Sequence, residues 1–324
     1  MEKAARPGPR RWATRRRRIA AAAAAVGGAL AVWLAWLGWP VPGRVSERLT
    51  ALNSAESGGW ERAGPDLRTL AVRVIGDSGL IVDLRVLRPI DSGETPLPVM
   101  MLLGGHRTGQ DAVDVVGHPG RLIVVALNYP YDGPDRVRGV RQIASALPKI
   151  RHALLDTPAA VSLALDWVLT QPWVLGGSVE LAGVSLGSQF AAAAGVLDPR
   201  FSRIWFVQGA GDSRQWLVHQ LRRRVESASI RHVAGSFLWW LAHGASLEPQ
   251  RWVAQIAPRP VIIVGSRDDA SLPPEWVTAF HEAAGTPKRL EWTAGAHINP
   301  RQPETVRPLL DLILAELQHD PDTS

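Results

Sequence analysis

The stretch SVELAGVSLGSQFAAAAGVL, residues 178–197, decides the fold of this chain. A short run rich in β-formers leads into Gly183-Val184-Ser185-Leu186-Gly187, and an alanine-rich helical pattern follows directly. A G-x-S-x-G motif between a strand and a helix is typical of a nucleophile elbow, a tight turn that exposes the serine hydroxyl and leaves no room for side chains at its glycines. We therefore predict that Ser185 is a nucleophile; an unreactive glycine-rich connection is the alternative interpretation.

Short apolar runs alternate with helical patterns on both sides of this motif, which indicates an α/β domain with a mostly parallel sheet. We predict eight strands, at residues 69–75, 80–88, 98–103, 121–127, 178–182, 203–208, 261–265 and 288–293. We predict helices at residues 156–171, 186–196, 274–284 and 303–318. The first two strands form a hairpin through Gly76-Asp77-Ser78-Gly79. The pattern predicts one domain over residues 69–318.

A serine nucleophile needs a base and an acid, and these follow two later strands in the order expected for this arrangement. Strand 261–265 is followed by Asp268 and Asp269, beyond the carboxyl end of a strand, where ligands gather in parallel sheets. The chain after strand 288–293 contains His297, in the loop before the last predicted helix. We predict Ser185, Asp268 and His297 as the catalytic residues, and Asp269 could exchange roles with Asp268.

An oxyanion requires hydrogen-bond donors, and the backbone offers two candidates. The N–H of Leu186 directly follows the nucleophile. The loop after strand 98–103 contains Gly104, Gly105 and His106, and paired glycines allow the backbone to approach a substrate closely. We predict the N–H groups of Leu186 and His106 as the oxyanion hole, with Gly105 as support; the alternative is that the two glycines only form a tight turn.

Together these motifs resemble the α/β-hydrolase superfamily, and most closely its dienelactone-hydrolase and prolyl-oligopeptidase-like esterase branch. The resemblance is carried by LLGGHRTG, ELAGVSLGSQFAAA followed by LDPRF, IAPRPVIIVGSRDD followed by PPEW, and GAH near the end of the chain. It implies the α/β-hydrolase fold, a Ser185–Asp268–His297 triad, and hydrolysis of an ester, thioester or amide through an acyl-enzyme, without a metal or cofactor. Two residues depart from the family pattern: Gly104 replaces a frequent histidine, and Ser188 replaces a common glycine.

Residues 213–258, between the strands at 203–208 and 261–265, form a 46-residue insertion with a helical pattern, at the place where this fold usually has its lid. Its tryptophans are Trp216, Trp239, Trp240 and Trp252. An apolar lid over Ser185 would exclude water and favour acyl or aromatic groups. The alternative is that at least two of these rings pack the insertion onto the body. The basic run 222–224 could meet an anionic substrate or lipid headgroups, or form an ordinary solvated face.

The positive charge of the chain is concentrated at one end. Residues 1–18 carry a net charge of +7, which leaves −1 of the total of +6 for the other 306 residues. A near-neutral body argues against a nucleic-acid partner. The absence of cysteine among the 324 residues excludes disulfides, cysteine-liganded metal sites and a thiol nucleophile.

Residues 19–41 contain no charge and are long enough to cross a bilayer as a helix. The basic residues before them predict that residues 1–18 are a cytoplasmic head and that the catalytic domain lies on the extracytoplasmic side. We predict an uncleaved single-pass signal anchor; the alternative is a cleaved signal peptide and a secreted protein. We predict that residues 42–68 are a linker and that residues 319–324 are a C-terminal tail.

The sequence thus predicts a membrane-anchored serine hydrolase that acts on a small-molecule or lipid-like acyl ester. Three alternatives remain: an acyltransferase of the same fold, a peptidase of the same fold, and an inactive membrane-tethered binding protein. A small prolyl-peptidase would normally carry a large N-terminal domain, and residues 42–68 are too few for one. The acyl group, the leaving group and the oligomeric state are not specified by the sequence.

Overall fold

The computed structural model describes residues 18, 20–32, 43–105, 108–134, 139–299, 301–302 and 305–318. The chain divides into two compact units, Met1–Pro40 and Val41–Ser324. In the first unit, residues 20–32 are helical, and the other residues of the predicted span at 19–41 lie outside the described residues. Among the helices that the structure describes, none combines the length and the apolar character needed to cross a membrane. The membrane anchor therefore stays a prediction.

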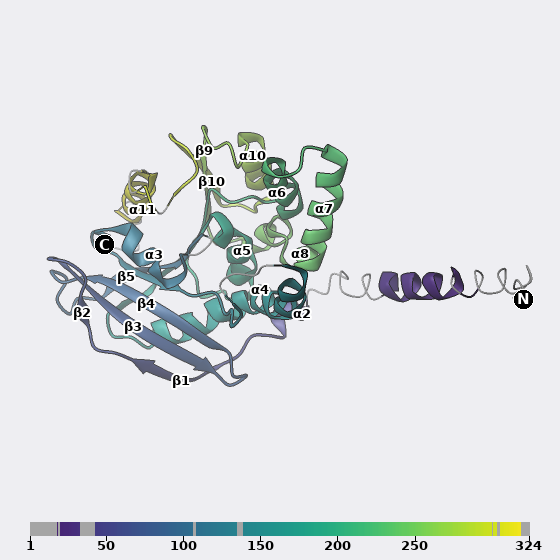
Figure 1. The fold of residues 1–324 in the computed structure, drawn as a ribbon. Coiled ribbons are helices and arrows are strands. Elements are labelled where there is room, and N and C mark those ends of the chain that lie inside the picture. The colour runs from purple at the N-terminus through teal and green to yellow at the C-terminus, as the bar shows by residue number, and fades with distance from the viewer. Residues whose placement is uncertain are drawn as a thin grey trace, which may run out of the picture. The chain divides into compact units, whose positions relative to one another are not determined.

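A twisted mixed sheet runs through the second unit (Figure 1). Its strands are β1 (Leu52–Ser57), β2 (Glu61–Arg62), β3 (Leu67–Gly76), β4 (Ile81–Pro89), β5 (Leu97–Leu103), β6 (Ile123–Leu127), β7 (Val174–Val184), β8 (Ile204–Val207), β9 (Val261–Ser266) and β10 (Lys288–Thr293). The order across the sheet is β1-β3-β4-β6-β5-β7-β8-β9-β10, and β2 pairs with β3. The six strands from β6 to β10 in this order are parallel, while β1, β3 and β4 are antiparallel to their neighbours.

All eight predicted strands are present in this sheet, but the prediction of eight strands in total was wrong. The described residues form ten strands, because β1 and β2 lie within residues 42–68, which we predicted to be a linker. Five of the six residues of β1 are exposed, so the strand has no buried face that would require apolar residues at alternate positions. Its sequence LNSAES therefore lacks the alternation that predicts a strand. The segment also contains the short helix α2 (Gly43–Ser46), whose Val45 is buried in the core.

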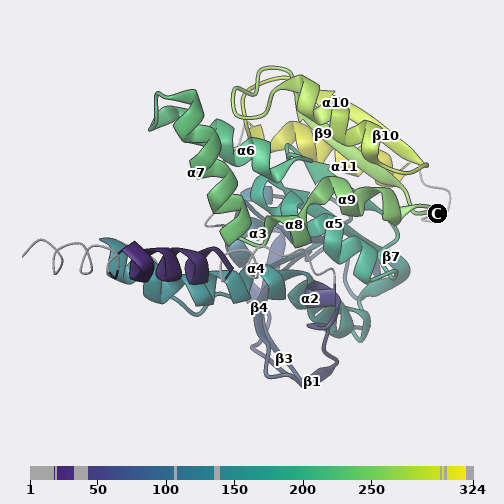
Figure 2. The same ribbon diagram turned by 90° about the vertical axis from the view of Figure 1, so that its right-hand side faces the viewer.

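Helices cover both faces of the sheet, as expected for buried parallel strands (Figures 1 and 2). On one face lie α4 (Gly139–Leu169), α5 (Ser188–Leu197) and α10 (Pro274–Ala283), and on the other lie α3 (Ala112–Val116) and α11 (Arg307–Gln318). Successive residues of a strand point to opposite faces, so Phe206 of β8 joins the first core while Trp205 and Val207 join the second. The two cores fix the carboxyl ends of the parallel strands, where the predicted site residues lie.

One helix differs strongly from the sequence prediction. Helix α4 begins at Gly139, much earlier than the predicted start at residue 156, and contains Pro148 and Pro158. Proline in a helix interior removes a backbone hydrogen bond, so the sequence argued against a continuous helix here. Burial of Leu163, Leu165 and other residues of its second half against the sheet holds the helix in place.

The insertion at 213–258 is helical, as predicted. It contains α6 (Ser213–Gln220), the 3-10 helix η3 (Leu221–Arg223), α7 (Ala228–Leu241), α8 (Gly244–Leu247), α9 (Pro249–Trp252) and the 3-10 helix η4 (Val253–Ile256). Helix α7 packs beside α6, and α9 packs against α5 (Figure 2). Trp216 and Trp252 pack against the core, and the indole N–H of Trp239 donates to Glu248 at 2.9 Å. Trp216 and Trp252 thus attach the insertion to the body, which was the alternative interpretation of the tryptophans, while the contact of Trp239 with Glu248 lies within the insertion.

Candidate active site

Ser185 lies at the sharp turn between β7 and helix α5, in the 3-10 turn η2 (Ser185–Gly187). Its φ of 53° lies in the left-handed region, which is rare for a residue with a side chain and marks the strained conformation of an elbow. A Cβ at Gly183 would lie 2.6 Å from Cβ of Ala191, and one at Gly187 would overlap the backbone of Leu103. The two glycines are therefore required by the packing of the turn, as the sequence predicted.

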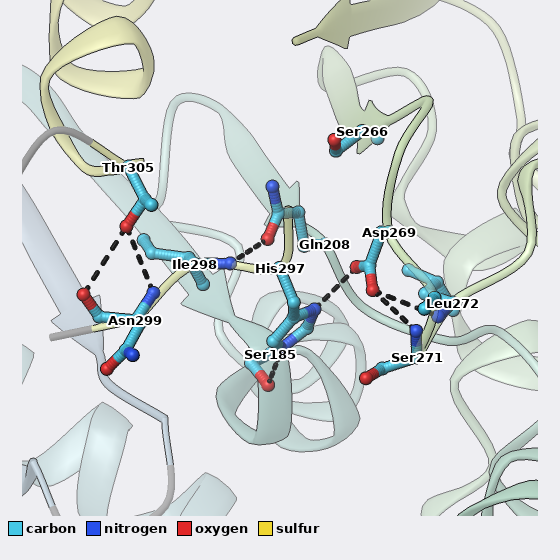
Figure 3. A network of polar contacts seen from close by, with 12 residues as sticks. Ser185, Gln208, Ser266, Asp269, Ser271, Leu272, His297, Ile298, Asn299 and Thr305 are labelled. Carbon is cyan, nitrogen blue, oxygen red and sulfur yellow. Dashed lines mark hydrogen bonds and ion pairs between the residues drawn. The ribbon is translucent and has the colours of Figure 1, made fainter. Parts of the chain in front are cut away.

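His297 reaches the serine from the loop between β10 and α11 (Figure 3). Its Nε2 lies 2.8 Å from Oγ of Ser185, which is hydrogen-bond distance although the two residues are 112 positions apart. The imidazole is about a quarter exposed, with 27% of its side-chain surface accessible, so it has access to both the serine and solvent. The prediction that Ser185 and His297 come together is confirmed by this geometry.

The carboxylate beside the imidazole belongs to Asp269, so the choice of Asp268 was wrong. Oδ2 of Asp269 lies 2.5 Å from Nδ1 of His297, and the Asp269 side chain is fully buried. Its Oδ1 accepts hydrogen bonds from the backbone N–H groups of Ser271 at 2.7 Å and Leu272 at 3.2 Å. Asp268 is exposed, and its Oδ2 accepts from the N–H of Gly295 at 3.2 Å. The turn after β9 directs the first carboxylate toward solvent and the second into the site.

Four side chains hold the loop that carries His297. Oε1 of Gln208 accepts from the N–H of Ile298 at 2.5 Å, and Oγ of Ser266 donates to the carbonyl of Gly295. Asp268 accepts from Gly295, as described above, and Oγ1 of Thr305 accepts from the N–H of Asn299 at 3.0 Å. Figure 3 shows the side chain of Gln208 pointing toward Ile298, beside His297. Asp268 is thus part of the support of this loop.

Comparison with known proteins agrees with this arrangement. The model of the Abhydrolase family matches residues 154–307, a range that contains Ser185, Asp269 and His297. The chain has the α/β-hydrolase fold, and residues 154–307 match this family of α/β-hydrolases. Within this superfamily, our assignment to the dienelactone-hydrolase and prolyl-oligopeptidase-like branch stays a prediction.

Solved α/β-hydrolases have the same fold at low sequence identity. An acetyl xylan esterase from Paenibacillus sp. R4 is 16% identical, with a TM-score of 0.58 over 84% of this chain and 92% of that one. Acetyl xylan esterase 1 from Thermoanaerobacterium sp. JW/SL YS485 is 15% identical, with a TM-score of 0.53 over 85% and 90%. A glucuronoyl esterase from Solibacter usitatus is 16% identical, with a TM-score of 0.54 over 83% and 86%. No curated protein matches the sequence of this chain.

The loop after β5 lies directly opposite Ser185. A Cβ at Gly105 would lie 3.7 Å from Cβ of Ser185, so the glycine backbone faces the serine. The carbonyl of Gly104 accepts from the hydroxyl of Tyr129 at 2.6 Å, and the carbonyl of Gly105 accepts from Oγ1 of Thr108 at 2.9 Å. Burial raises the pKa of Tyr129, which keeps its phenol protonated as the donor.

Of the predicted oxyanion donors, one lies within the described residues. The N–H of Leu186 belongs to the first turn of the helical segment after Ser185, where backbone N–H groups have no intrahelical partner. His106 lies outside the described residues. Ser188, which departs from the family pattern, is fully buried, and its hydroxyl donates to the carbonyl of Gly183 at 2.7 Å. This serine therefore stabilises the elbow from within.

A cavity of about 280 Å³ adjoins Ser185. Ser185 and His297 lie on its wall, which is completed by side chains from β5, β6, β7, β8, α3 and α11. The described residues of the 213–258 insertion contribute no lining residue, so the structure does not show a lid over Ser185. The described residues also contain no group of three or more His, Asp or Glu side chains arranged to hold a metal ion.

Gln208 and the cavity were not found by sequence reasoning. Gln208 directly follows β8, and a site residue is expected at the carboxyl end of a parallel strand, but the neutral glutamine carries no motif. The cavity is assembled from six elements distant in sequence, so no local pattern indicates it.

Proposed function

We propose that this protein is a serine carboxylic-ester hydrolase that works through an acyl-enzyme on Ser185. The observation that carries the proposal is the continuous contact from Oγ of Ser185 to Nε2 of His297 and from Nδ1 of His297 to Oδ2 of Asp269. This is the arrangement by which a serine hydroxyl, a poor nucleophile by itself, is activated. An inactive binding protein would not require an aligned triad of this kind.

Each residue has a distinct task in the proposed reaction. Ser185 attacks the ester carbonyl while His297 accepts the hydroxyl proton at Nε2 and then donates it to the leaving alcohol. Asp269 holds Nδ1 of His297, fixes the tautomer and stabilises the imidazolium. A water molecule activated by His297 then hydrolyses the acyl-enzyme. We assign the stabilisation of the negative oxygen in both tetrahedral intermediates to the N–H of Leu186 and, on the sequence prediction alone, to that of His106.

Hydrolysis of an ester is supported by two further considerations. The solved neighbours named above are esterases, so the analogy of fold favours ester hydrolysis for this chain. The site has a small apolar cavity beside Ser185 and a partly exposed imidazole at His297, which suits a substrate with one apolar part. The natural ester is not specified by these features.

The test is ester hydrolysis by the full chain, measured beside its Ser185→Ala variant. We expect the wild type to hydrolyse p-nitrophenyl acetate and butyrate and to be labelled covalently by a fluorophosphonate, and we expect the variant to do neither. Thermal melting of both proteins would establish that the variant is folded. Equal esterase activity in the two proteins, or fluorophosphonate labelling of Ser185→Ala, would contradict the assignment of the nucleophile.

A further inference from the structure

The cavity beside Ser185 lies between the sheet and two helices. Its floor is formed by Met100 of β5, Val124 of β6 and Val207 of β8, all at most 3% exposed. Val116 of α3 and Leu310 of α11 line it from the helix side. It therefore extends from the nucleophile into the second core of the protein, on the face of the sheet opposite to α4 and α5.

The walls of the cavity are apolar except near the catalytic residues. Among the residues that the structure describes, the polar side chains on its wall are those of Ser185, His297 and Thr108, and the hydroxyl of Thr108 donates to the carbonyl of Gly105. The remaining lining side chains are Ala, Val, Leu, Ile and Met. Such a surface gives no partner to a sugar hydroxyl or a charge, and burying an unpaired polar group costs free energy. An alkyl chain is the group that fits it.

The two halves of an ester have different requirements at this site. The alcohol must receive a proton from His297 and then depart to solvent before water can enter, so it needs an open path. The acyl group stays attached to Ser185 until the second step and can occupy a closed space. Because the cavity extends from Ser185 between the sheet, α3 and α11 toward the second core, it suits the half of the substrate that remains bound.

We propose that this cavity is the acyl-chain site, and that the protein prefers esters of medium-length aliphatic acids over acetates. This inference rests on the proposed esterase function. With about 30 Å³ for each water-sized group, 280 Å³ accommodates on the order of nine such groups, which is a chain of hexanoyl to octanoyl length. Each methylene buried in an apolar site favours binding by about fourfold. The preference would distinguish this protein from enzymes that act on acetyl groups.

The experiment compares kcat/KM of the full chain for p-nitrophenyl acetate, butyrate, hexanoate, octanoate and dodecanoate. We expect kcat/KM to rise at least about tenfold from acetate to the hexanoate or octanoate and to fall at dodecanoate. Val116→Phe, which fills the cavity, should lower the octanoate-to-acetate ratio at least about tenfold. Leu310→Ala, which enlarges the cavity, should move the optimum to a longer chain.

Leu312→Ala is the matched control for Leu310→Ala, because Leu312 lies on the same helix and packs against the same core but does not line the cavity. The control should keep the wild-type chain-length profile. A parallel series of acetate esters with alcohols of increasing length should not respond to Val116→Phe. Thermal melting and fluorophosphonate labelling of every variant would show that it is folded with a reactive Ser185.

The outcomes separate this proposal from the proposed function. If acyl-chain preference is the same in wild type, Val116→Phe and Leu310→Ala while Ser185-dependent hydrolysis persists, the acyl site lies elsewhere. A response of the alcohol series to Val116→Phe would make the cavity a leaving-group site and overturn the inference. If no ester of any length is hydrolysed in a Ser185-dependent way, the esterase assignment itself fails.

Discussion

Oε1 of Gln208 accepts a hydrogen bond of 2.5 Å from the backbone N–H of Ile298, the residue that follows His297. Gln208 itself is held in place, because its own N–H donates to the carbonyl of Val264 at 2.7 Å and its side chain is buried. Its φ of 48° lies in the left-handed region, so the backbone bends sharply here to direct the side chain to the histidine loop. The glutamine therefore links the end of β8 to the position of the general base.

Gln208→Met should lower kcat by about tenfold, because it keeps the shape of the side chain but removes the strong acceptor for the Ile298 N–H. The effect should fall on kcat with little change in KM, since Gln208 positions His297 and does not line the cavity beside Ser185. Gln208→Glu retains an acceptor and should recover part of the loss. Gln255→Ala, an exposed change, is the control. Steady-state kinetics with one ester should be measured for the wild type and the three variants. An unchanged kcat in Gln208→Met would contradict the positioning role.

The two neighbouring aspartates provide a second test. Asp269→Asn should lower kcat by about 10³- to 10⁴-fold, because an amide cannot hold the required tautomer of His297 or stabilise its charged form. Asp268→Asn should cost less than about tenfold, since among the described residues Asp268 accepts its hydrogen bond from the loop backbone at Gly295 and not from His297. The measurement is kcat for both variants with the same ester. A reversal of the two effects would restore the original choice of Asp268.

The elbow glycines are required by packing. A Cβ at Gly187 would overlap the carbonyl of Leu103, a backbone atom that cannot move without shifting β5. Gly187→Ala should therefore lower the free energy of unfolding by about 1–3 kcal/mol, as overpacking of a closed site does. Gly176→Ala is the control, because nothing lies within 4 Å of a Cβ there. Urea unfolding of both variants measures the difference, and equal stability would show that the turn can relax.

The parts of the fold that the sequence predicted are those with strong local signals. Strands β5, β6 and β9 are buried on both faces, so they read as uninterrupted apolar runs. The strand β1 was missed because it is exposed and polar, and it is held by backbone pairing with β3 rather than by burial. The pattern of apolar residues along a strand reflects which side chains are buried. An edge strand whose residues are nearly all exposed therefore has no such pattern.

The sequence predicted those site residues that have a motif or a characteristic place in the chain. Ser185 has a motif, and His297 follows a strand at the expected place in the chain. The choice between Asp268 and Asp269 depends on which side chain the turn after β9 buries, and both residues have the same chemistry. That choice is made by tertiary structure: Oδ1 of Asp269 binds two backbone N–H groups while its Oδ2 faces the imidazole.

Away from the site, a second histidine lies buried against an arginine. Nε2 of His243 accepts from Nε of Arg151 at 3.1 Å, a contact that only the neutral imidazole can accept. Burial, followed by the positive charges of Arg151, Arg44, Arg48 and His152, lowers the pKa of His243 to about 4. His243 adopts a left-handed φ of 55°, which asparagine tolerates better than most residues.

This depressed pKa predicts a loss of stability in acid. In the unfolded chain His243 has a pKa of about 6.5 and takes up a proton below that pH, whereas in the folded protein it stays neutral until about pH 4. The unfolded state therefore binds more protons in this interval, and the free energy of unfolding falls as the pH is lowered from about 6.5 to about 4. His243→Asn should be less stable than the wild type at about pH 7, where the contact with Arg151 is lost, and should lose less stability on acidification. Urea unfolding of both proteins at about pH 7 and about pH 5 measures how the free energy of unfolding changes with pH in each. The same change in both proteins would show that His243 does not cause the loss of stability in acid.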